Sequence, residues 1–97
     1  MKIGVIDYKI TEVSGLKDGN IDLNGHIIYN DMEIKLEKSL APIPKAITLL
    51  HEILHGIIIQ SGWKHNELLI EMLSYNLYQV LKDNHKEIMG YIEGEVK

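Results

Sequence analysis

The pattern of hydrophobic and polar residues changes once along the chain, near Leu40. Before this point, apolar residues occupy every second position in two segments: Ile6, Tyr8, Ile10 and Met32, Ile34, Leu36. A period of two is typical of strands with one buried face. From Pro44 onward the apolar residues follow the helical period instead. The sequence therefore predicts strands followed by helices, which is an α+β fold.

Turn residues divide the first part into short strands. Asn24-Gly25 lies between the apolar segments 21–23 and 27–29, and this dipeptide favours a two-residue hairpin turn. Asn30-Asp31 predicts a second turn. We therefore expect a small antiparallel sheet, with residues 32–37 as its last strand and its edge.

Two helices are predicted in the second part, with a short third helix in the tail, residues 85–97. The first begins near Pro44 and ends at Ser61-Gly62, and the second begins after Asn66 and ends near Asp83. A short turn around Trp63 predicts that they are antiparallel neighbours. We expect the sheet to pack on this pair, and six apolar residues of the second helix to belong to the core: Leu69, Met72, Leu73, Leu77, Val80 and Leu81.

Composition limits the class of protein. A chain of 97 residues, 45% of them hydrophobic, predicts one soluble globular domain over residues 1–97. The net charge of −4 argues against a nucleic-acid partner, and no stretch approaches the roughly 20 apolar residues of a membrane span. The early charge at Asp7 argues against a secretory signal, so we expect a cytoplasmic protein. The absence of cysteine excludes disulfides and thiolate metal ligands.

The segment His51-Glu52-Ile53-Leu54-His55 matches the H-E-x-x-H pattern inside the first predicted helix. Residues four apart lie one turn apart on the same face, so the two imidazoles can bind one metal ion. A glutamate next to the first histidine then lies near the water on that ion. Between residues 46 and 59 the polar side chains fall within one stripe of an otherwise apolar helix, which we interpret as buried. Buried imidazoles and a carboxylate need a partner, and a divalent cation supplies one.

Zinc requires a third protein ligand, and the chain offers His65, Glu67 and Glu71. If the helices are antiparallel about residue 63, Glu71 lies level with His55, while Glu67 lies about one turn short. His65 would lie about 9 Å from His55 along the axis. We therefore predict Zn²⁺ bound by His51, His55 and Glu71, with Glu67 as the alternative if the turn is tighter. The metzincin pattern is excluded, because it needs a glycine at 58 and a histidine at 61.

These residues resemble a known family. Segments 25–29 and 33–36, the metal-binding helix 46–55, and the stretch Glu71-Met72-Leu73-Ser74-Tyr75-Asn76-Leu77 are similar to the ImmA/IrrE-like metallopeptidases. Residues 77–84 resemble the small phage and prophage members. The resemblance implies a minimal zincin-like domain and a zinc-dependent peptidase that cuts a specific protein. In it Glu71 stands where the family has its third ligand, while Ser74 replaces the more usual alanine.

The expected activity is therefore that of a zinc metalloendopeptidase of the gluzincin ligand type. Glu52 is expected to act as the general base, and a peptide or protein is the expected substrate. The strand 32–37 could hold an extended substrate by backbone pairing, or it could be a plain sheet edge. The alternative is an inactive metal-binding module that regulates a protein partner. A structural zinc site needs a fourth ligand, which only His65 could supply.

Overall fold

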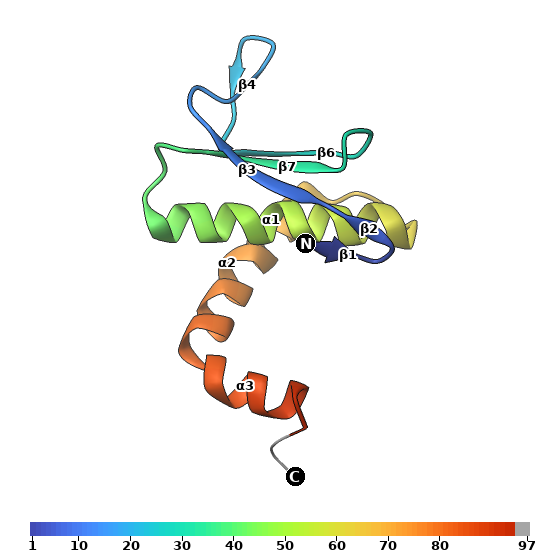
Figure 1. The fold of residues 1–97 in the computed structure, drawn as a ribbon, viewed down its shortest axis with the longest axis vertical. Coiled ribbons are helices and arrows are strands. Elements are labelled where there is room, and N and C mark those ends of the chain that lie inside the picture. Colours follow the sequence, from blue (N-terminus) through green and yellow to red (C-terminus); the bar gives the residue numbers. More distant parts are fainter. Residues whose placement is uncertain (95–97) are drawn as a thin grey trace.

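The computed structural model describes residues 1–94; the last three residues of the predicted tail, 95–97, lie outside the described residues. The strands are β1 (Lys2–Ile3), β2 (Ile6–Asp7), β3 (Lys9–Val13), β4 (Lys17–Asp18), β5 (Ile21–Asp22), β6 (Gly25–Ile28) and β7 (Glu33–Glu37). The helices are α1 (Pro42–Ser61), α2 (Glu67–Asp83) and α3 (His85–Ile92). The expected α+β class is confirmed, with strands above and helices below (Figure 1).

The main sheet has three strands in the order β3-β7-β6. Strands β6 and β7 form an antiparallel hairpin, and the bond from Met32 N–H to the Tyr29 carbonyl, 3.2 Å, closes the turn predicted at Asn30-Asp31. Strand β3 pairs with β7 in parallel, with Ile10 opposite Ile34. Two further pairs, β1–β2 and β4–β5, are antiparallel and very short.

Three expectations about the strands are wrong. The main sheet is mixed rather than antiparallel, because β3 pairs with β7 in parallel. Residues 32–37 form the central strand rather than the edge, because β3 lies on one side of β7 and β6 on the other. The hairpin turn is not at Asn24-Gly25. It lies between β4 and β5, around Gly19-Asn20. Residues 24 and 25 belong to the pairing with β7 instead: the Asn24 carbonyl accepts from Glu37 N–H at 2.8 Å, and Gly25 lies opposite Leu36.

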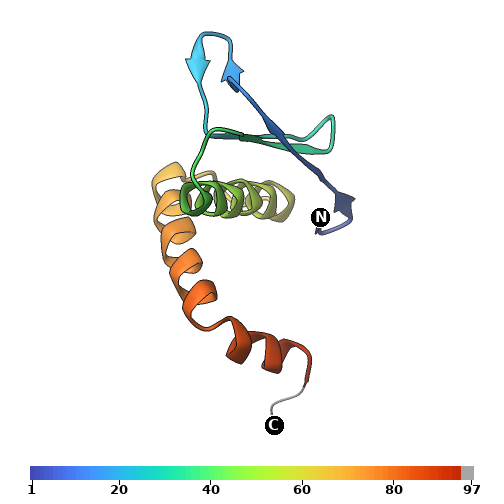
Figure 2. The same cartoon turned by 60° about the vertical axis from the view of Figure 1, so that its left-hand side comes forward.

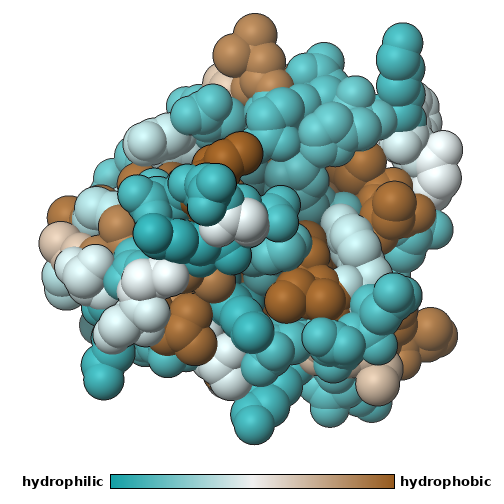
Figure 3. All heavy atoms as spheres, turned by 90° about the horizontal axis from the view of Figure 1, so that it is seen from above, coloured by the Kyte–Doolittle hydropathy of each residue, from teal (hydrophilic) through white to brown (hydrophobic). Residues whose placement is uncertain are grey.

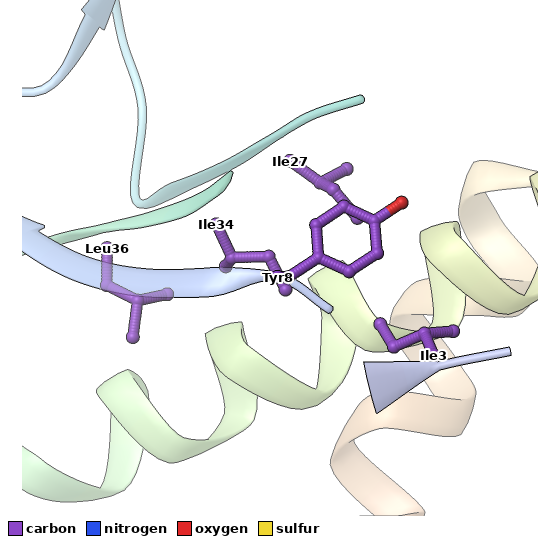
Figure 4. Packing of buried hydrophobic residues seen from close by; sticks show 5 residues of the cluster. All are labelled: Ile3, Tyr8, Ile27, Ile34 and Leu36. Atoms are coloured by element: carbon purple, nitrogen blue, oxygen red, sulfur yellow. The ribbon is translucent and has the colours of Figure 1, made fainter. Parts of the chain in front are cut away.

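The hydrophobic core lies between the main sheet and α1. It contains five buried side chains, shown in Figure 4: Ile3, Tyr8, Ile27, Ile34 and Leu36. Leu49 and Ile53 of α1 pack against them, and the buried Gly56 gives Ile3 and Ile27 room to approach the helix. The alternation seen in the sequence of β7 thus has its cause here, because Ile34 and Leu36 both point to α1.

The ends of the helices follow local signals. Gly62 ends α1 in the left-handed conformation, at φ 70°, which glycine adopts without steric cost. The Asn66 side chain accepts from Leu69 N–H at 3.1 Å and caps α2. The predicted helix 66–83 and the short third helix are confirmed, and α1 begins two residues before Pro44.

Helix α2 does not run antiparallel beside α1. The linker 62–66 doubles back along α1, and α2 then crosses α1 steeply and leads away from the sheet, followed by α3 (Figures 1 and 2). The buried residues of α2 are Ile70 and the small Ser74. Helices α1 and α2 therefore contact each other at one crossing point, and not side by side along their length as antiparallel neighbours would.

The assignment of six apolar residues of α2 to the core is wrong. All of them are exposed to between 36 and 50%: Leu69, Met72, Leu73, Leu77, Val80 and Leu81. Helix α1 is also less covered than its composition suggests, since Glu52 and Gly56 are its only buried residues. By length and composition alone, α1 is long and apolar enough to cross a membrane, contrary to the sequence expectation. In this fold it lies instead along the sheet (Figure 2).

The carboxylate of Glu37, the last residue of β7, accepts hydrogen bonds from two neighbouring segments of the chain. It accepts from the N–H groups of Leu16 at 2.8 Å and Ser39 at 3.0 Å, and from the Ser39 hydroxyl at 2.9 Å. These bonds favour the charged form and lower the pKa of Glu37 to about 2. The group therefore stabilises the fold above its ordinary pKa of 4.5, and this contribution is lost as the pH falls toward 2.

We expect Glu37→Gln to lower the melting temperature at pH 7, because a neutral amide makes weaker bonds to the same donors. The difference from the parent chain should shrink as the pH falls from 4.5 to about 2, where the parent carboxylate is also protonated. Thermal unfolding followed by circular dichroism across this range measures both effects. A difference that stays constant with pH would show that these bonds do not depend on charge.

Candidate metal centre

The two histidines of the H-E-x-x-H segment lie on one face of α1. Their Nε2 atoms are 3.1 Å apart, and their ring centroids are 4.8 Å apart. Both side chains are mostly buried, with 19% of His51 and 16% of His55 exposed. Burial is the main cause that lowers the pKa of His55, and a neutral imidazole is the form that binds a metal.

The third member of this group is Glu67, the first residue of α2. Its Oε1 lies 2.7 Å from His51 Nε2, and its Oε2 lies 3.0 Å from His55 Nε2. One atom from each of the three side chains lies within 4.8 Å of the others. Two imidazoles and one carboxylate are the donor set of thermolysin-type zinc sites, so the residues fit a zinc ion.

The path of the chain explains why Glu67 reaches the histidines. If the helices were antiparallel about residue 63, Glu67 would lie about one turn away from the level of His55 along α1. In the structure the linker 62–66 runs back along α1 before α2 begins (Figure 1). Glu67, the first residue of α2, therefore reaches both imidazoles. Glu71 is one turn further along α2 and lines the same cleft. It is not one of the three grouped side chains, and its role as ligand stays a prediction.

Glu52 lies on the sheet side of α1, between the histidines and β6. It is 7% exposed, and its Oε1 accepts from Ile27 N–H at 3.0 Å. Burial raises the pKa of Glu52, and the charge of His51 and the bond from Ile27 oppose that rise. A carboxylate whose pKa is raised by burial is suited to accept and return a proton.

His51 and Glu67 of this group line a cleft of about 270 Å³. The cleft lies between α1, α2 and the start of β6, and its walls include Gly25, Glu52, Glu67, Glu71 and Tyr75. This volume is slightly below that of typical small-molecule pockets, so it suits a short part of a chain rather than a whole cofactor. The predicted base therefore shares one opening with His51, Glu67 and Glu71.

Gly25 sets the distance between β6 and α1. A Cβ atom at this position would lie 2.5 Å from Thr48 Cγ2 and 3.2 Å from Glu52 Cγ. We expect Gly25→Ala to lower the free energy of unfolding by about 1–3 kcal/mol, because the strand or helix must shift. In Gly25→Ala/Thr48→Ser the nearest clashing methyl is absent, so part of that loss should return. Urea unfolding measures both, and a stabilised Gly25→Ala variant would contradict the close approach.

A third imidazole stands beside the group. The ring of His65 stacks on that of His55, with centroids 5.0 Å apart, and its Nε2 lies 3.2 Å from Glu67 Oε2. Its side chain is 60% exposed, which leaves it free to turn. The sequence prediction that His65 is too far from His55 is therefore wrong, for the same reason that Glu67 is close. No protein-family model, curated protein or solved structure matches the chain.

Proposed function

We propose that the protein is a zinc-dependent metallopeptidase of the ImmA/IrrE-like kind. The observation that carries the proposal is the convergence of His51, His55 and Glu67 on one point beside the buried carboxylate of Glu52. A donor set of this type with an adjacent glutamate is typical of zinc peptidases. The expected substrate is a peptide or protein, met in the cytoplasm.

The roles of the residues follow from their positions. His51, His55 and Glu67 would hold the zinc ion, which would supply a Lewis acid and an acidified water. Glu52 would accept a proton from that water and return it to the leaving amine. The bond from Ile27 N–H fixes one oxygen of Glu52, so the carboxylate keeps its orientation while the other oxygen, Oε2, lies next to Gly25 at the cleft.

The strand that would hold an extended substrate is β6 and not residues 32–37, which are paired on both sides. In β6 the N–H of Ile27 turns away from β7 toward Glu52. Backbone groups alternate along a strand, so those of Gly25 also point to the open edge. Gly25 lines the cleft, and a substrate strand added there would pass over the candidate metal centre.

Zinc content tests the proposal. Protein purified without chelators should contain one zinc per chain, and Glu67→Ala should lose it while Glu71→Ala keeps it. The opposite result would make Glu71 the third ligand, as the sequence first suggested. Both variants conserve the length of α2, and each serves as the control for the other. A parent chain that binds no divalent metal would overturn the proposal.

A second function is favoured by the position of His65. A turn of this exposed side chain would add a third imidazole, and four protein ligands make a closed, structural zinc site. The chain would then be a metal-binding regulatory module without hydrolytic activity. Cobalt substitution separates the two: an absorption spectrum that changes in His65→Phe shows ligation, whereas an unchanged spectrum shows that His65 only stacks on His55.

A further inference from the structure

One side of α2 carries an apolar surface that the other described residues cover only in part. On a helical projection, the positions within about 120° on this side are all apolar. Ile70 is one of them and is buried; the others are Leu69, Leu73, Leu77, Val80 and Leu81, and we call these five the α2 stripe. Each of the five is 36 to 43% exposed. Such a stripe ordinarily faces a core, and here more than a third of each residue stays exposed.

The α2 stripe continues into a hollow where the three helices meet. Leu81 forms part of its wall, and the other residues around it are Ala46, Leu49, Leu50, Tyr78, Lys82 and His85. Beyond it, Tyr91 and Ile92 of α3 are 63 and 70% exposed. By contrast, the face seen from above the sheet is mainly hydrophilic, with separate hydrophobic patches (Figure 3). Uncovered apolar surface therefore gathers on the helices.

The solvent-accessible surface of the chain is larger than that of a compact monomer of the same mass. A compact monomer of 11.1 kDa exposes about 5,650 Å², whereas this chain exposes 7050 Å². Its radius of gyration is 14.5 Å, against about 12.5 Å for a compact domain of the same length. Two parts project: the β4–β5 hairpin and the arm made of α2 and α3 (Figure 1). Three of the four strand residues of the hairpin are charged and suit water, so the arm is the part that needs a cover.

We propose that two copies of this chain associate through the α2 stripe and the adjoining hollow, with their arms packed against each other. The excess surface is about 1,400 Å² per chain, and a stable homodimer buries about 1,000–2,500 Å² per partner. This excess includes the share of the hairpin, and its size lies within the range that a homodimer covers. The α2 stripe carries no charge, so a second identical stripe meets it without repulsion. The charged residue of the hollow is Lys82, whose Nζ lies 5.6 Å from the centroid of the Tyr78 ring. Glu67 lies off the stripe, which leaves the metal centre outside the interface.

Sedimentation equilibrium of the parent chain between about 1 and 100 µM tests this association. The expected mass is twice 11.1 kDa at the upper concentrations. The double variant Leu69→Glu/Val80→Glu should sediment as a monomer while keeping its helical circular dichroism. Ile21→Glu is the matched control, because Ile21 is 66% exposed on the hairpin and should leave the mass unchanged.

A second measurement does not depend on a folded variant. If two copies associate, the melting temperature of the parent chain should rise with protein concentration. A parent chain that remains a monomer at 100 µM with a constant melting temperature would overturn the proposal. So would a monomer that binds neutral lipid vesicles through the same residues, since a membrane surface would then be the cover. A double variant that stays dimeric would place the interface elsewhere and would equally overturn it.

Discussion

Replacing Glu52 by glutamine should leave zinc bound and reduce peptide hydrolysis by about 10²–10⁴-fold, which is the usual contribution of a general base. Glutamine has the same shape, and its carbonyl oxygen can still accept the bond from Ile27 N–H. It cannot accept a proton from water. We therefore expect kcat to fall with little change in zinc content or melting temperature, measured on an unstructured protein substrate with added zinc.

Glu87→Gln is a suitable control for this variant. Glu87 lies on the exposed face of α3, outside the cleft, and the same change of charge there should leave hydrolysis intact. If Glu52→Gln hydrolyses the substrate as fast as the parent chain, another group supplies the base. If neither the parent nor the variant hydrolyses while both bind zinc, the regulatory module becomes the better account.

The helices could be predicted because their signals are local. Asn66 caps α2 through its own side chain, and Gly62 ends α1 with a backbone conformation that other residues avoid. The strand pairings could not be predicted in the same way. The parallel partner of Ile34 is Ile10, 24 residues away, and nothing in either segment distinguishes β3 from β6 as the neighbour of β7. Alternation predicts which face is buried and leaves the partner open.

The third member of the metal group shows what a local pattern leaves open across one linker. Glu67 and Glu71 lie one turn apart on the same side of α2, so the pattern offers both. The choice between them depends on where α2 begins relative to α1. A tight turn favours Glu71, whereas a linker that runs back along α1 brings Glu67 to the histidines. The path of five linker residues cannot be derived from helical periodicity.

The α2 stripe shows a different limit of the same reasoning. Helical periodicity correctly predicts that Leu73, Leu77 and Val80 share one side of the helix. It does not say whether that side meets the chain's own core or another chain. The steep crossing of α2 over α1 buries Ile70 and Ser74 and leaves the stripe outside. An apolar face therefore predicts that the helix makes a contact, and it does not identify the surface that the helix contacts.

Replacing either histidine of the H-E-x-x-H segment by alanine should weaken zinc binding by at least about 100-fold. Loss of a ligand costs more than the 10–100-fold that is typical when a residue supporting a ligand is lost. Zinc should raise the melting temperature of the parent chain and leave that of His51→Ala or His55→Ala nearly unchanged, because a ligand stabilises the folded state only when its concentration exceeds its dissociation constant. Competition with a metallochromic chelator measures the affinity.

His85→Ala, on the exposed start of α3, should bind zinc as the parent does. Equal losses in all three variants would show binding to scattered imidazoles rather than one centre, and an unchanged His51→Ala would remove that residue from the ligand set.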